Sequence, residues 1–162
     1  MIIIDKVLTI LRSMTSIKTV LYQSGFSANV TLDRKEGPIA LTYLMTDYDI
    51  DISKGVAKES TNIEIFFCNR TKLDITGDQK DTLINGMSLI AREFLSKLLA
   101  DKAIYVVDDS IKVRCNYGKF DCFVAGVSLN LRLKERQGDC IYTEPEPEPT
   151  NNQGGNNEEN EG

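Results

Sequence analysis

The clearest pattern in the chain is the alternation of apolar and polar residues over 120–134. The apolar residues fall on even positions up to Val124 and on odd positions from Val127, with Ala125 and Gly126 between them. Successive side chains of a strand point to opposite faces, so this change of phase exchanges the buried and exposed sets. A glycine at the change predicts a β-bulge that bends one long strand and resets its facing.

Other periodic segments predict the remainder of one domain. Apolar residues at helical spacing predict a short amphipathic helix over 2–15 and a long one over 79–100. Thr76 and Gln79 have the spacing of a capping box at the start of the long helix, and Gly86 inside it indicates a close approach to another backbone. Apolar alternation predicts strands at 16–22, 28–33, 39–45, 61–68, 104–107 and 111–116.

The predicted strand at 61–68 carries apolar residues on both of its faces. Ile63, Ile65 and Phe67 lie on one face, and Glu64 is the only charge in the segment. A strand of this kind is central in its sheet or covered on both sides. An edge with so little charge is also suited to pairing with another chain. We therefore expect these three apolar residues either in the core or in a sheet shared between subunits.

The order of the predicted elements gives the fold class. Helices and strands are segregated rather than alternating, which is typical of an α+β domain. We expect a single, mostly antiparallel sheet on which the long helix and the short N-terminal helix pack. The polar stretch over 47–60, with a turn signal at Lys54-Gly55, is predicted as a loop that reaches a neighbour or lines a channel. Its candidate interaction residues are Asp47, Asp49, Asp51, Lys54 and Lys58.

Charge separates the end of the chain from the rest. The 162 residues contain 19 Lys and Arg and 24 Asp and Glu, and residues 137–162 hold seven of the acids and no base. A Glu-Pro repeat followed by Asn, Gly and Glu cannot bury enough apolar surface to offset the entropy of ordering. We therefore divide the chain into a domain over 1–141 and an acidic tail over 142–162, flexible or ordered only against a neighbouring subunit. The tail residues expected to lie along that neighbour are Tyr142, Glu144, Glu146 and Glu148.

The residue types argue against an enzyme. The chain has no histidine, which excludes Ser–His and Cys–His catalysis, and it has no glycine-rich phosphate loop before a helix. Asp108 and Asp109 leave a carboxylate-dependent enzyme as a formal alternative, although a turn between strands explains them better. No apolar run is long enough to span a membrane, and the N-terminus lacks the basic start of a signal peptide.

Neither metal ions nor cofactors are expected. The run 47–51 imitates the start of a calcium loop, but Ile52 and Lys58 stand where that loop needs glycine and a bidentate glutamate. The four cysteines have no Cys-x-x-Cys spacing, so zinc is disfavoured. In a reducing cytoplasm these thiols are expected to act as small buried apolar groups.

The closing segment FDCFVAGVSLNLRL, at 120–133, resembles the tail-terminator and tail-completion family of tailed bacteriophages. The helical start, an early hairpin and the long helix over 79–100 match as well, so the resemblance covers about residues 1–136. The acidic tail is not part of the family pattern. An unbroken strand at Gly126 would remove the bulge and with it much of this family argument.

The resemblance implies a structural virion protein, assembled in the bacterial cytoplasm, that forms a homo-oligomeric ring at the head–tail junction. It implies contacts with neighbouring portal, neck or tail proteins, and a channel that DNA could pass through without sequence-specific binding. No membrane contact is expected. The alternative is a small cytoplasmic adaptor whose acidic tail recruits a basic partner.

Overall fold

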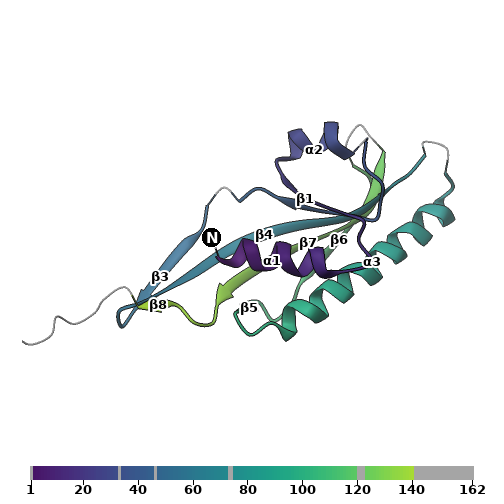
Figure 1. Ribbon diagram of the computed structural model, residues 1–162. Helices are drawn as coiled ribbons and strands as arrows, with labels where there is room; N and C mark the ends of the chain where they lie inside the picture. The colour runs from purple at the N-terminus through teal and green to yellow at the C-terminus, as the bar shows by residue number, and fades with distance from the viewer. Residues whose placement is uncertain (1, 33, 46, 73–74, 120–122, 141–162) are drawn as a thin grey trace, which may run out of the picture.

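The computed structural model describes residues 2–32, 34–45, 47–72, 75–119 and 123–140 (Figure 1). Three helices and eight strands follow one another in these residues. Their bounds are α1 Ile2–Ser13, β1 Thr19–Gln23, α2 Gly25–Leu32, β2 Ile39–Tyr43, β3 Asp49–Ser53, β4 Val56–Arg70, α3 Gly77–Ala100, β5 Ile104–Val106, β6 Lys112–Lys119, β7 Val124–Glu135 and β8 Asp139–Cys140.

One sheet is built around the two long antiparallel strands β4 and β7. Their pairing runs without interruption from Ser60 opposite Lys134 to Arg70 opposite Val124. Strands β2 and β3 follow one another along the outer side of β4, and β1 lies beyond β2 as the only parallel neighbour among the described strands. Strands β5 and β6 lie along the far side of β7. The predicted α+β class with a mostly antiparallel sheet is confirmed.

The sheet has a core on each face. On one face α1 and α3 cover apolar residues of β4 and β7, and the rings of Phe67 and Phe94 lie 5.7 Å apart between sheet and helix. On the other face α2 covers a smaller core that includes Phe66 and Val124. Figure 1 shows α2 at one end of the sheet, away from β3 and β8 at the other. Of the two roles predicted for Ile63, Ile65 and Phe67, the structure therefore places them in the core: β4 is a central strand, not an edge.

The predicted bulge at Gly126 is wrong. Strand β7 pairs with β4 in one continuous register, and the irregularity in this region lies on β6, between Asn116 and Lys119. The change of phase has another cause, because both faces of the sheet are covered at this end. Val124 belongs to the core under α2, whereas Ala125 and Val127 belong to the core under α1 and α3.

Two further segments differ from their predictions. Residues 28–32 lie in the helix α2 and not in a strand, because Ala28 and Leu32, one helical turn apart, are both fully buried on its inner side. The predicted early hairpin is therefore wrong, and β1 pairs with β2 instead, in parallel. Ser24 begins this helix, its hydroxyl accepting a hydrogen bond from the amide of Ser27 at 3.3 Å. The predicted approach of a backbone to Gly86 is also absent, since a Cβ added there would meet nothing within 4 Å.

The predicted capping box of α3 is confirmed. The Thr76 hydroxyl accepts a hydrogen bond from the Gln79 amide at 3.3 Å, and the Gln79 side chain accepts one from the Thr76 amide at 3.0 Å. We expect Thr76→Ala to lower the free energy of unfolding by about 1 kcal/mol, because one amide of the first turn loses its acceptor. Urea unfolding followed by circular dichroism measures this. Thr76→Ser should keep most of the stability, and equal loss in both variants would contradict a role for the hydroxyl.

Candidate subunit interface: a projecting hairpin and two open sheet edges

Strand β3 and the first residues of β4 form a hairpin that projects from the body of the molecule (Figure 1). We call residues 49–60 the arm. Its turn is formed by Lys54 and Gly55, which both have positive φ, 50° and 74°, as hairpin turns of type I′ require. The sequence therefore predicted this turn correctly, but the segment around it is a pair of strands and not a loop.

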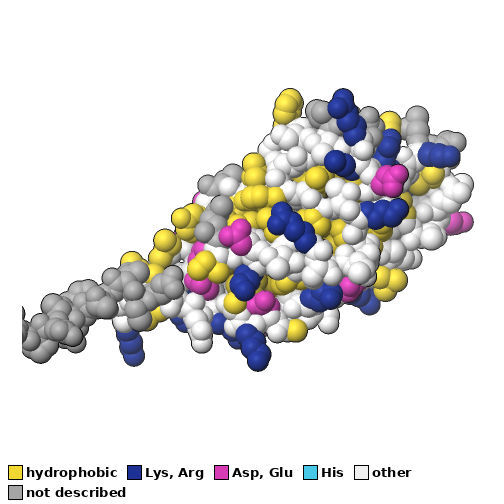
Figure 2. Space-filling view, viewed as in Figure 1, with side chains coloured by type: hydrophobic (Ala, Val, Ile, Leu, Met, Phe, Trp, Pro, Cys, Tyr) yellow, Lys and Arg dark blue, Asp and Glu magenta, His cyan; other side chains and the backbone are white. Residues whose placement is uncertain are grey.

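One face of the arm is apolar and exposed. Ile50 and Ile52 stand opposite Glu59 and Ala57 of β4, on the face of the sheet that α1 and α3 cover in the body. They keep 56% and 67% of their surface exposed, and Tyr48, just before β3, keeps 49%. Figure 2 shows hydrophobic side chains gathered along the arm. A projecting stripe of this kind is typical of a surface that another chain covers.

The opposite face of the arm is charged and tied to the body. Asp51 Oδ2 lies 2.6 Å from Lys134 Nζ of β7, and Lys58 Nζ donates a hydrogen bond to the carbonyl oxygen of Arg136 at 2.8 Å. Asp49 shares this face with Asp51, since both alternate with the isoleucines along β3. The arm thus presents acidic side chains on one face and isoleucines on the other.

Buried carboxylates fix the root of the arm. Glu59 Oε2 accepts a hydrogen bond from the amide of Ile2 at 2.8 Å, at the first turn of α1, where a negative charge is favourable. The amide of Glu59 in turn donates to Glu135 Oε2 at 3.1 Å, and both glutamates are buried. These bonds connect the arm to α1 and β7, so the arm leaves the body in a defined direction.

The sheet ends in strands whose outer sides are open. Within the described ranges, β3 pairs with β4 alone and β6 pairs with β7 alone. The unpaired amides and carbonyls of such edges form a template for another strand. On β6, Val113 and Cys115 are exposed, so the prediction that the thiols are buried is wrong for Cys115 and confirmed for Cys68. Cys115 stands on β6, an edge strand that pairs with β7 alone among the described strands, whereas Cys68 lies on the central strand β4.

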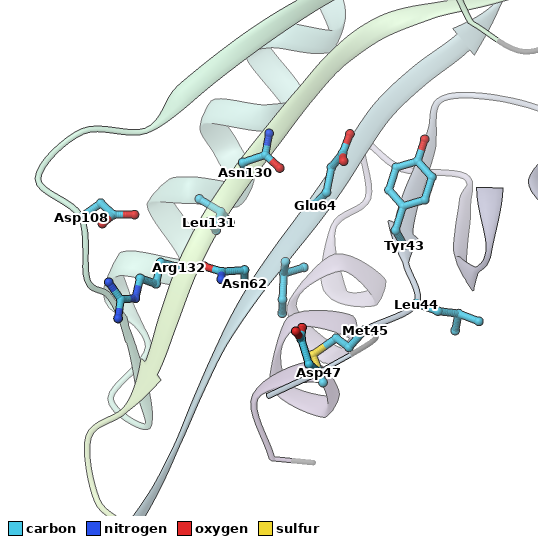
Figure 3. A pocket seen from close by; sticks show the side chains of 11 residues that line it. Tyr43, Leu44, Met45, Asp47, Asn62, Glu64, Asp108, Asn130, Leu131 and Arg132 are labelled. Carbon is cyan, nitrogen blue, oxygen red and sulfur yellow. The ribbon is translucent and has the colours of Figure 1, made fainter. Parts of the chain in front are cut away.

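A shallow pocket of about 430 Å³ lies where β2 gives way to β3 along β4 (Figure 3). Asn62 and Glu64 of β4 and Arg132 of β7 line it, with Asp47 on one side and Asp108 on the other. Amide, carboxylate and guanidinium groups mix here. No group of three His, Cys, Asp or Glu side chains that could hold a metal ion occurs in the described part of the chain.

The structure brings most of the predicted loop residues together on the arm. Asp49, Asp51, Lys54 and Lys58 belong to it, and Asp47 precedes it, with its carbonyl accepting from the Thr61 hydroxyl at 3.2 Å. The predicted tail residues lie outside the described residues: Tyr142, Glu144, Glu146 and Glu148.

Sequence reasoning did not single out Ile50, Ile52 or the strand β6 as candidate interface residues. The signal that could have found the isoleucines is the strict Asp-Ile-Asp-Ile alternation.

The pairing of Lys134 with Asp51 raises the pKa of Lys134, chiefly through the hydrogen bond to the carboxylate. Because the folded-state pKa is raised, the contribution of this pair is present at neutral pH and is lost only as the pH rises above the usual lysine range. We expect Asp51→Asn to lower the pKa of Lys134 in an NMR titration, and Asp49→Asn to leave it unchanged. An unaltered Lys134 pKa in Asp51→Asn would show that the pair does not form.

None of the described helices is both long and apolar enough to cross a membrane. In comparison with known proteins, the chain matches no family model and no curated protein sequence.

Proposed function

We propose that this chain is a structural assembly protein that forms a homo-oligomeric ring, located at the head–tail junction of a tailed bacteriophage. The observation that carries the proposal is β3, an edge strand on a projecting arm, which pairs with β4 on one side only and exposes Ile50 and Ile52. Many proteins blunt such edges with charge, proline or a covering element. Strand β3 carries its charges, Asp49 and Asp51, on one face only, and its other face is apolar and exposed. Here the arm extends the edge away from the body.

The energetics favour many weak contacts over one strong one. Full burial of an isoleucine side chain contributes about 1.5–3 kcal/mol, so the two residues of one arm give a modest contact between two copies. In a closed ring every copy makes a contact on each side, and the last contact forms within a single particle. A ring is therefore the assembly in which such an arm is most effective.

The assignment to a phage rests on the resemblance over residues 1–136. The N-terminal helix and the long helix support it. The early hairpin and the bulge at Gly126 do not, because Gly25–Leu32 is the helix α2 and β7 is unbroken. Neighbouring portal, neck or tail proteins are the partners that follow from this proposal. Alignment of Tyr142, Glu144, Glu146 and Glu148 along an adjacent subunit stays a prediction.

The test is the mass and shape of the purified full chain. Light scattering and negative-stain electron microscopy should give closed particles of uniform mass, and mass spectrometry should find the chain in purified virions of a phage that encodes it. A monodisperse monomer at high concentration would contradict the ring, and absence from such virions would contradict the location.

Comparison of the full chain with a chain that ends at residue 142 distinguishes the proposed ring from the alternative, an adaptor. If the acidic tail is an accessory, the shortened chain still assembles. A monomer whose only measurable activity is salt-sensitive binding of a basic protein, lost on shortening, would favour the adaptor instead.

A further inference from the structure

We infer that β3 of one copy pairs antiparallel with β6 of the next copy, so that the acidic edge of the sheet joins its basic edge. This inference rests on the proposed ring and names the two surfaces that form it. The occupant of the open β3 edge is a second copy of this chain, and the two strands lie on opposite edges of the same sheet.

The two edges have matching side-chain patterns. Strand β3 reads Asp-Ile-Asp-Ile and β6 begins Lys-Val-Arg-Cys. On β6, Val113 stands opposite Leu129, which is buried in the core under α1 and α3. Lys112 and Arg114 therefore face the other side of the sheet, the same side as Asp51 of β3. Continuing the sheet sets acids beside bases on one face and apolar side chains together on the other.

The strand directions follow from the observed pairings. Strand β3 is antiparallel to β4, β4 to β7, and β7 to β6. Strands β3 and β6 thus run in opposite directions, and a sheet continued from one copy to the next brings them together as an antiparallel pair. In the register that sets β3 against residues 112–116, the regular part of β6, Asp51 stands opposite Arg114, Ile52 opposite Val113 and Ile50 opposite Cys115.

A small groove lies beside β6 on the apolar face. It has a volume of about 160 Å³ between α3 and the sheet, and Ala91, Leu95, Val113 and Leu129 form most of its lining. Its position next to Val113 is where the inferred register brings Ile52 of the neighbouring arm. The groove would take a branched aliphatic side chain that is 67% exposed in the isolated chain.

The inferred contact is heterologous, since each copy offers one edge of each kind. Contacts of this type give rings or open filaments, according to whether the rotation closes. Strand β3 lies level with residues 56–60 of β4, whereas residues 112–116 of β6 lie level with 64–68. Each join is therefore staggered along the strands, and closed sheets combine such a stagger with strand tilt.

Two complementary variants test the inference. Ile50→Asp/Ile52→Asp disables β3, and Val113→Asp/Arg114→Glu disables β6; these side chains are exposed, so both variants should fold, which circular dichroism checks. Each variant alone should be monomeric. An equimolar mixture should give a 1:1 dimer through the one intact pair of edges, with at least tenfold tighter association than either variant with itself. A mixture that stays monomeric would overturn the inference, as would assembly of either variant alone.

A cross-link tests the register without weakening the contact. In Ile50→Cys the new thiol should form an intermolecular disulfide with Cys115, giving a ladder on a non-reducing gel, and the ladder should vanish in Ile50→Cys/Cys115→Ser. If the wild-type chain forms rings but neither the dimer nor the ladder appears, the inferred pairing of β3 with β6 is wrong, whereas the proposed ring is still supported. If the wild-type chain is a monomer, the proposed function itself fails.

The acidic tail is the other segment that could bind the basic edge strand β6. Removal of the tail distinguishes this possibility from binding by β3. In the chain ending at residue 142, Arg114→Glu should still weaken assembly at least tenfold. If the effect of Arg114→Glu disappears on truncation, the tail and not β3 binds β6, and the inference is overturned.

Discussion

Replacing Ile50 and Ile52 together with aspartate is expected to convert the assembled chain into a monomer without unfolding it. The two side chains are exposed in the isolated chain, so the substitution removes no core contact. In an assembly, however, it places two unpaired charges in an apolar interface, which is strongly unfavourable. Sedimentation velocity should show a single species of monomer mass at concentrations where the wild-type chain is fully assembled.

The matched control is Ile50→Val/Ile52→Val. Valine keeps the apolar character and the β-branch, so this variant should assemble with only a small loss of affinity. The midpoints of urea unfolding should agree for monomeric forms of the wild type and the valine variant, because the arm face is outside the core. Ile50→Asp sets a second carboxylate opposite Glu59, so the aspartate variant should unfold at a slightly lower urea concentration. Retention of the wild-type mass in the aspartate variant would show that the arm is not the contact.

Replacing Gly126 with alanine is expected to lower the stability of the fold by about 3 kcal/mol, at the upper end of what overpacking costs. A Cβ at this position would overlap the carbonyl oxygen of Phe67 and lie 2.7 Å from the Cα of Cys68. Both are backbone atoms of β4, which cannot move without disturbing the continuous pairing with β7 and the cores on both faces.

Gly86→Ala is the matched control, and we expect it to raise the stability of the fold rather than lower it. A Cβ there meets no neighbouring atom within 4 Å and sits in the interior of α3, where alanine is favoured over glycine by up to about 1 kcal/mol. Urea unfolding of both variants measures the two changes. Similar effects at the two glycines would contradict the close approach of β4 and β7 at Gly126.

The sequence predicted correctly those elements whose own residues carry a regular apolar pattern or a capping motif. The helical periods of α1 and α3, the cap at Thr76 and the two-sided apolar pattern of β4 each follow from contacts that the structure confirms. The eight-residue helix α2 was not predicted. Among the side chains of α2 that the structure describes, only Ala28 and Leu32 are buried, and two apolar positions are too few to distinguish a helix from a strand.

The remaining differences come from tertiary contacts. The change of phase in β7 depends on the position of α2 over the sheet, because α2 covers Val124. The local sequence of β7 carries no information about that position. The arm was predicted as a loop because its aspartates outweigh its isoleucines in a polar stretch. The bonds of Glu59 to Ile2 and Glu135 join residues 57 and 76 positions apart, a distance beyond any periodicity.

The central claim is that copies of this chain meet along β3, and amide hydrogen exchange measures this most directly. Exchange should be compared between the dilute monomer and the concentrated assembly of the full chain. Alternate amides of β3 and β6 already bond β4 and β7 in the monomer. We predict that the remaining amides of residues 49–53 and 112–116, which point outward, become protected on assembly, while amides of α1 change little. Free exchange across residues 49–53 in the assembled particle would contradict the claim.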